Sequence, residues 1–213
     1  MLGIHDLALF VLSAVLLNLT PGPDTLFVIG QATRGRRAGV MAALGIGAGC
    51  LVHIVGATIG LSALLLASAT AFAIVKGLGA VYLVWVGLAL LLARAAAAAT
   101  VPAGGVERPD GRRIFFRGAL TNALNPKVAM FFLAFLPQFV DPAAPDRALG
   151  FLALGCLFNV TGTLWNLTLA VLAARAVGQR PAALRAAAWF RRGVGAVFVG
   201  LGLKLALGAR ASA

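Results

Sequence analysis

Long runs of apolar residues, separated by short segments that carry most of the charge, dominate the sequence. Each run is close to or above the ~20 residues that an α-helix needs to cross a bilayer. The pattern predicts an all-α membrane protein with about six transmembrane helices, over residues 7–29, 39–66, 77–93, 118–140, 148–174 and 193–208. Five spans would result if the first run, which prolines interrupt, only dipped into the membrane.

Composition and charge narrow the class of protein. With 61% hydrophobic residues, 11% charged residues and a mean hydropathy of +0.98, the chain is too apolar for a soluble domain. The net charge of +12 would suggest nucleic-acid binding in a soluble chain, but the basic residues lie mostly between the apolar runs. There they fix topology and contact anionic headgroups, so we expect membrane lipids and no nucleic acid as partners.

The basic residues are distributed unequally between the two sides of the predicted bundle. Thirteen of the 18 lysines and arginines fall in the first, third and fifth connections. By the positive-inside rule these connections face the cytoplasm, which places both termini in the periplasm of a multi-pass protein of the bacterial inner membrane. The third connection, residues 95–113, has no apolar periodicity and is expected to link two halves.

Two pairs of similar segments indicate an internal repeat. Residues 76–82 read KGLGAVY and residues 192–198 read RGVGAVF, while residues 49–56 read GCLVHIVG and residues 155–162 read GCLFNVTG. Each copy has three spans, so the second copy must cross the membrane in the opposite sense. The sequence thus predicts one domain over 1–208 that consists of inverted repeats, 5–94 and 114–208, an architecture typical of secondary transporters.

The first and fourth spans are both broken by proline next to a charged residue. Pro21 and Pro23 remove two backbone donors from the first span, and Pro126 removes one from the fourth. Asp24 and Lys127 follow directly, and an ionised side chain inside a span is disfavoured by at least ~2.5 kcal/mol. Both breaks are therefore candidates for a substrate site.

These features resemble the LysE/RhtB-type amino-acid exporters. The resemblance is carried by Thr20-Pro21-Gly22-Pro23-Asp24, the glycine-rich second span with His53, residues 77–87, and above all FRGALTNALNPKVAMFFLAFLPQFV over residues 116–140. It implies export of amino acids or related small zwitterions, driven by the proton gradient. By position, one family motif matches Pro21, Gly22, Pro23 and Asp24, and another matches Asn125, Pro126 and Lys127. Many family members have asparagine in place of Asp24.

A zwitterionic amino acid presents a carboxylate and an ammonium, and each needs a complementary group in a site of low dielectric. Lys127, with backbone donors at the helix break, is expected to bind the carboxylate. Asp24 and the carbonyls freed near Pro21 and Pro23 are expected to bind the ammonium. The structural alternative is a permanent ion pair between Asp24 and Lys127 that only fixes helix packing.

Other polar residues at membrane depth are candidates for the pathway. His53 can titrate near neutral pH and has Asn159 as its counterpart in the repeat, so it is either a proton relay or an interhelical hydrogen-bonding group. A further set of polar residues in the predicted spans is expected to face the bundle interior, and half of the set is expected to contact a solvated cavity. The set is Asn18, Asn122, Asn125, Asn159, Thr161, Thr163 and Asn166. Lys204, near the outer end of the last span, is expected to reach the membrane surface.

Other classes of function have less support in the residues. A membrane thiol-redox carrier is the alternative, because Cys50 and Cys156 occupy equivalent positions in the repeat, although they lie away from the proline breaks. The sequence has no His-Glu-x-x-His or Gly-x-Ser-x-Gly motif and no cluster of metal ligands within the spans. We expect a transporter and not an enzyme, with no cofactor and no metal. The substrate and the oligomeric state, a homo-oligomer included, stay open.

Overall fold

A computed structural model describes residues 2–68 and 110–175 without interruption, and a few single positions over 70–88 and 196–203. In the continuous ranges the backbone is helical except for turns and one isolated β-bridge. The elements are α1 (Leu7–Leu19), α2 (Pro23–Ala32), α3 (Arg36–Ala67), α5 (Gly111–Ala123), α6 (Pro126–Met130), a π-helical turn η1 (Phe131–Phe135), a 3-10 turn η2 (Leu136–Phe139) and α7 (Arg147–Arg175). The all-helical class predicted from sequence is confirmed for this part of the chain.

Two of these helices, α3 and α7, are each long and apolar enough to cross a membrane. The others form two bent pairs: α1 and α2 are bent by 54°, and α5 and the segment from α6 to η2 by 44°. Counting each bent pair as one span gives four, in agreement with the predicted spans 7–29, 39–66, 118–140 and 148–174. The predicted spans 77–93 and 193–208, with Lys204 and most of the 95–113 linker, lie largely outside the described residues, so the inverted repeat remains a prediction.

The first bend coincides with the predicted break at Pro21 and Pro23. α1 ends at Leu19 because neither proline has an N–H to continue the helical ladder. Pro23 then occupies the first turn of α2, where a missing N–H is tolerated and the fixed φ suits a helix start. Asp24 consequently lies in the first turn of a restarted helix.

The second bend has the same construction. Pro126 is in the first turn of α6, and Asn125 caps that helix by accepting a hydrogen bond at 3.0 Å from the backbone N–H of Lys127. Lys127 therefore occupies, in the second broken pair, the place that Asp24 occupies in the first, directly after the proline of a restarted helix.

α5 begins at Gly111, seven residues before the apolar run that predicted the fourth span. Asp110 caps this helix by accepting a hydrogen bond at 2.9 Å from the backbone N–H of Arg112. The first two turns also carry Arg113 and Arg117, so the helix extends beyond its apolar core into a charged segment. Hydropathy marks only the apolar part, which is why the predicted boundary fell inside the helix.

Glycines allow α3 and α5 to pack with their backbones in contact. A Cβ atom at Gly45 would overlap the carbonyl oxygen of Phe115, and one at Gly49 would overlap that of Ala119. From the other side, a Cβ at Gly118 would lie 2.8 Å from the carbonyl oxygen of Ala42. Small residues spaced four apart permit this close approach in membrane helices, where packing rather than burial from water holds helices together.

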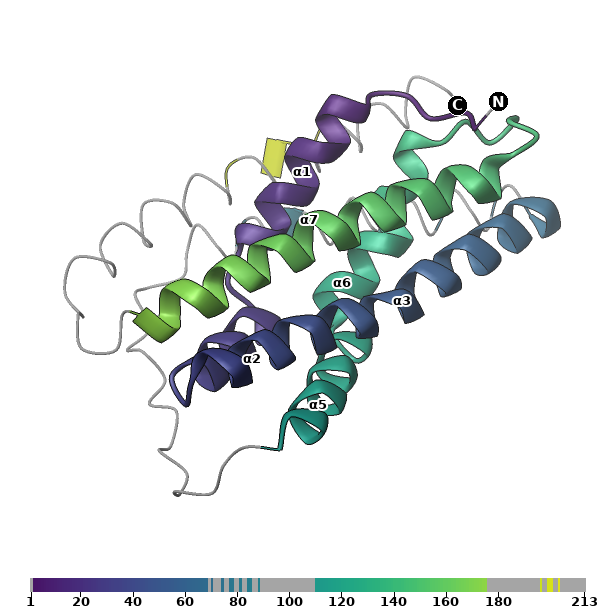
Figure 1. The fold of residues 1–213 in the computed structure, drawn as a ribbon. Coiled ribbons are helices and arrows are strands. Elements are labelled where there is room, and N and C mark those ends of the chain that lie inside the picture. The colour runs from purple at the N-terminus through teal and green to yellow at the C-terminus, as the bar shows by residue number, and fades with distance from the viewer. Residues whose placement is uncertain are drawn as a thin grey trace.

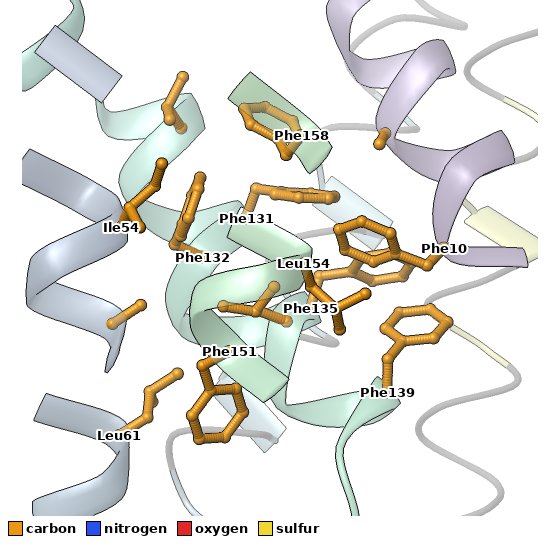
Figure 2. Packing of buried hydrophobic residues seen from close by; sticks show 14 of the residues in the cluster. Phe10, Ile54, Leu61, Phe131, Phe132, Phe135, Phe139, Phe151, Leu154 and Phe158 are labelled. Carbon is orange, nitrogen blue, oxygen red and sulfur yellow. The ribbon is translucent and has the colours of Figure 1, made fainter. Parts of the chain in front are cut away.

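The apolar core consists of two clusters at different depths of the bundle. The larger, aromatic cluster joins α1, η1, η2, α3 and α7 and has edge-to-face contacts such as Phe10 with Phe139, 5.3 Å between ring centroids. Figure 2 shows its rings, of which Phe131 stacks on Phe158 at 4.8 Å. The smaller cluster joins α2, α3, α5 and α7 and is made of short side chains: Val28, Ala32, Ala38, Ala42, Ala43, Ile46, Ile114 and Ala170.

The two ends of the bundle differ in charge. At one end the N-terminal segment pairs with the segment after η2, where the N–H of His5 donates to the carbonyl of Phe139 at 3.0 Å. The opposite end contains the turn between α2 and α3, the start of α5 and the end of α7 (Figure 1). That end carries seven arginines of the described residues, namely Arg34, Arg36, Arg37, Arg112, Arg113, Arg117 and Arg175.

Candidate functional site

A cavity of about 30 Å³ lies at the level of the two helix breaks, between the aromatic and the short-chain cluster. That volume holds about two water molecules, which is less space than an amino acid needs. It is lined by Leu17, Asn18, Asp24, Thr25, Ile46, Gly47, Cys50, Asn122, Lys127, Val128, Phe158, Asn159, Gly162, Thr163 and Asn166. Every long helix and both broken pairs contribute to this wall.

The Lys127 ammonium is bonded to the end of α1. Its Nζ donates to the carbonyl of Thr20 at 2.9 Å and to that of Leu17 at 3.2 Å. In an unbroken helix the Leu17 carbonyl would accept from the N–H of residue 21, but that residue is Pro21. The Leu17 carbonyl accepts instead from the backbone N–H of Thr20 at 3.1 Å, and the lysine of the second broken pair adds a second donor to it.

Asp24 is held by one carboxylate oxygen only. Its Oδ2 accepts a hydrogen bond at 2.8 Å from the Asn122 amide, and both residues are buried. Asp24 Oδ1 and Asn122 Oδ1 are also buried but have no hydrogen-bonding partner. Two residues that line the cavity therefore each carry an unsatisfied acceptor, which is costly unless a donor fills the space.

Asp24 and Lys127 do not form an ion pair in this conformation. The ammonium binds α1 instead, and the carboxylate binds Asn122. The Asp24–Lys127 ion pair considered from sequence is therefore absent in this conformation, and two carbonyls near the first break, those of Leu17 and Thr20, are bonded to Lys127.

His53 lies behind the cavity wall rather than in it. Its Nε2 is 2.8 Å from the backbone carbonyl oxygen of Asn122, and its ring stacks on Phe132 at 6.0 Å between centroids. Because a carbonyl only accepts, Nε2 carries the proton of this bond. Of the two interpretations from sequence, the interhelical hydrogen bond is present, and it supports the residue whose side chain holds Asp24.

The structure brings together most of the residues that the sequence singled out. Asp24, Lys127 and Asn159 line the cavity, Pro21 to Pro23 form the first break, and Asn125 with Pro126 forms the second. Five members of the polar set line the cavity, namely Asn18, Asn122, Asn159, Thr163 and Asn166. Asn125 and Thr161 do not line it.

Several wall residues carried no signal in the sequence. Thr25, Gly47 and Gly162 belong to helices that are apolar on most sides, so no periodicity marks the face that they share. The Leu17 and Thr20 carbonyls were missed as ligands of Lys127 because the bond joins positions more than 100 residues apart. The freed carbonyl at a proline break was the one usable hint.

The two cysteines, which occupy equivalent positions in the predicted repeat, differ in their surroundings. Both are free thiols; Cys50 is buried and lines the cavity, whereas Cys156 is exposed on the outside of α7. Within the described ranges, no three His, Cys, Asp or Glu side chains are grouped as a metal site would require.

Comparison with known proteins gives a consistent result. Residues 15–209 match the family described as LysE type translocator. An uncharacterised membrane protein of Pseudomonas aeruginosa is 36% identical over 96% of both chains, and one of Vibrio cholerae is 36% identical over 72% of this chain and 74% of its own. A leucine efflux protein of Salmonella typhimurium is 32% identical over 74% of each chain. No solved structure matches the chain significantly.

Proposed function

The chain belongs to the LysE type translocator family, and from that premise we propose that it exports neutral aliphatic amino acids from the cytoplasm in exchange for protons. The observation that carries the proposal is the cavity at the two helix breaks, in which Asp24 has an unpaired oxygen, Lys127 an N–H beyond the two bonded to α1, and one wall is apolar. Each part of a neutral amino acid has a complement there.

The substrate ammonium is assigned to the two unsatisfied acceptors. Asp24 Oδ1 and Asn122 Oδ1 are buried, unpartnered and on adjacent elements, so an ammonium between them would make two hydrogen bonds, one to a carboxylate. Hydrogen bonds to charged groups contribute about 1.5–3 kcal/mol each.

The substrate carboxylate is assigned to Lys127 and the backbone beside it. An ammonium has three N–H donors, and Lys127 uses two of them on α1, which leaves one. The N-terminus of α2 also lies at the first break, where a negative charge is favoured. Asn159, on α7, adds a side-chain amide to the same wall.

The side chain of the substrate is assigned to the apolar wall. Leu17, Ile46, Val128 and Phe158 contribute carbon surface, and Cys50 contributes a small apolar thiol. An aliphatic side chain fits this surface, whereas a second charge in the substrate would have no described partner on it. The leucine efflux relatives agree with this choice.

Exchange with protons follows because a proton and the substrate ammonium share one acceptor oxygen. Asp24 Oδ1 can hold either a proton or the substrate ammonium, and the two compete for the same oxygen. A carrier that crosses only when that oxygen is occupied then moves protons inward and substrate outward. His53, hydrogen-bonded to the backbone of Asn122, keeps the Asn122 amide in place against Asp24 in both states.

The cavity lies between an aromatic cluster and a cluster of short side chains, and each can act as a closing layer. We place the arginine-rich end in the cytoplasm, so that the short-chain layer closes the cytoplasmic side and the aromatic layer the periplasmic side. Inverted repeats over 5–94 and 114–208 would exchange these roles during transport, as in other carriers with broken helices.

An export assay tests the proposed function. Cells that express the chain and are fed dipeptides that contain leucine, isoleucine, valine, lysine or aspartate should accumulate extracellular leucine, isoleucine or valine above cells that carry an empty vector. Lysine and aspartate should not accumulate, because the apolar wall offers no partner for a second charge. Accumulation of no amino acid at all, by a protein found in the membrane, would contradict the proposal.

The orientation predicts which connections react with an impermeant thiol reagent. In a variant with Cys50 and Cys156 replaced by serine, Asp110→Cys should be protected in intact cells because α5 begins on the cytoplasmic side. Ala143→Cys, exposed in the turn after η2, should be labelled from outside. Labelling of Asp110→Cys in unbroken cells would reverse the assigned orientation.

A thiol-redox carrier is the second candidate function, and replacement of the two cysteines distinguishes it from an amino-acid exporter. Replacing Cys50 and Cys156 together by alanine should leave most export intact, because both are free thiols and only Cys50 contacts the cavity. The measurement is leucine export normalised to membrane-inserted protein. Complete loss of activity in a correctly inserted double variant would favour the thiol-redox carrier.

A further inference from the structure

We propose that the end of α1 is a site for a monovalent cation, and that the Lys127 ammonium is its permanent, covalently tethered occupant. In this view the carrier holds within its own chain the positive charge that other broken-helix carriers take from a dissolved ion. The inference rests on the proposed transport function, which it extends to the question of ion dependence: export should need no sodium.

The end of α1 has the composition of a cation site. Pro21 removes the N–H that would bond the Leu17 carbonyl in a continuous helix, so this carbonyl keeps only a bond at 3.1 Å from the N–H of Thr20, and the Thr20 carbonyl belongs to the C-cap at the end of α1. The partial negative charge at a helix C-terminus adds to this local field. Unwound carbonyls of this kind are what coordinates cations in discontinuous membrane helices.

A second, independent observation places a cation in this site. The buried ammonium of Lys127 lies 2.9 Å from the Thr20 oxygen and 3.2 Å from the Leu17 oxygen, although Asp24 lines the same cavity. Asp24 is only 8% exposed and keeps one oxygen without a partner. The lysine is thus bonded to two neutral carbonyls while the carboxylate of the same cavity accepts from Asn122, as expected if those carbonyls form a defined cation site.

The surrounding residues leave room for this arrangement and hold it. A Cβ atom at Gly22 would lie 3.2 Å from Nζ and 3.5 Å from Cε of Lys127, so glycine clears the path of the side chain. Asn125 fixes the backbone at Lys127 through the cap of α6. Any motion that separates α6 from α1 must break the contacts of Nζ, which couples the two broken helices.

Truncation of Lys127 followed by chemical rescue tests the proposal. Lys127→Ala removes a group equivalent to propylammonium and opens the site, whereas Lys127→Met fills the same space with an uncharged chain. Purified wild-type protein and both variants would be reconstituted in vesicles, with leucine transport measured in sodium, potassium or choline salts and with added propylammonium. Propan-1-ol serves as the uncharged analogue of similar size.

We expect wild-type transport at equal rates in all three salts. Lys127→Ala should be inactive in choline and should recover at least tenfold with propylammonium or sodium, but not with propan-1-ol, while Lys127→Met should respond to none of them. The thermal midpoint of Lys127→Ala in detergent should also rise with propylammonium, and that of Lys127→Met should not.

The outcomes separate this inference from the proposed function. If wild-type protein transports leucine but neither cation restores or stabilises the inserted Lys127→Ala variant, the cation site is wrong and the exporter stands. A sodium requirement of the wild-type protein would also overturn the site. If wild-type protein transports no amino acid, the proposed function fails, and the thermal shift of Lys127→Ala still decides whether the end of α1 binds a cation.

Discussion

Export is expected to fall to the background level in Lys127→Met. The substitution removes the donors of the bonds to Leu17 and Thr20 and the proposed anchor of the substrate carboxylate. Leaving a buried carbonyl without a donor destabilises the fold by about 1–3 kcal/mol. The variant should therefore still insert, while its two broken helices lose the bonds that connect them. Leucine export normalised to inserted protein measures the effect, and export above half of the wild-type rate would exclude Lys127 from the mechanism.

Asp24→Asn is expected to be milder, with export reduced by roughly tenfold. An amide still presents an oxygen to the substrate ammonium, and the difference between a charged and a neutral hydrogen bond, about 1.4 kcal/mol, corresponds to one factor of ten. The Asn122 amide can donate to that oxygen as it does to Asp24 Oδ2. Exchange with protons should nevertheless be lost, because an amide does not titrate in this range.

The double variant Lys127→Met with Asp24→Asn distinguishes a binding role from a packing role. If the two charges only compensated each other, removing both would remove the unpaired burial and export would return. The structure argues against this result, because Lys127 Nζ donates to α1 carbonyls. The double variant loses these bonds, and the second substitution, Asp24→Asn, does not replace them. We expect no recovery in the double variant; recovery would withdraw Lys127 as the carboxylate-binding residue.

The location of the site could be predicted from sequence because two kinds of residue are rare at membrane depth. Proline next to a charge, at Pro23 with Asp24 and at Pro126 with Lys127, marks a break that lipid does not tolerate unless protein covers it. The polar set followed from the same rule, since an asparagine such as Asn122 must face the bundle interior. These signals are local, so one sequence suffices to find them.

The partners of those residues could not be predicted, because they depend on how helices face one another. Asp24 and Lys127 were candidates for an ion pair by charge alone, yet Lys127 reaches carbonyls on α1 and Asp24 reaches Asn122 on α5. α3 and α7 are apolar around most of their circumference, so hydropathy gives no facing direction for Gly47 or Gly162. Backbone acceptors carry no sequence signature at all.

The second large effect is expected at the contact between α3 and α5, where Gly49→Leu should abolish export through loss of the fold. A Cβ atom at this position would already overlap the backbone carbonyl of Ala119, and backbone cannot move aside as a flexible side chain can. Inserting one extra group into a packed core destabilises the fold by about 1–3 kcal/mol, and a leucine adds four carbon atoms where none fits. α5 would have to separate from α3, which would displace Asn122 from Asp24.

Gly56→Leu is the matched control on the same helix. No atom lies within 4 Å of a Cβ built at Gly56, so leucine meets open space there. Both variants gain the same helix propensity over glycine, about 0.8–1 kcal/mol, so their difference reports packing alone. We expect Gly56→Leu to retain export and its thermal midpoint, and Gly49→Leu to lose both, with a midpoint lower by about 2–4 °C per kcal/mol. Equal midpoints for the two variants would show that α3 and α5 do not pack through Gly49.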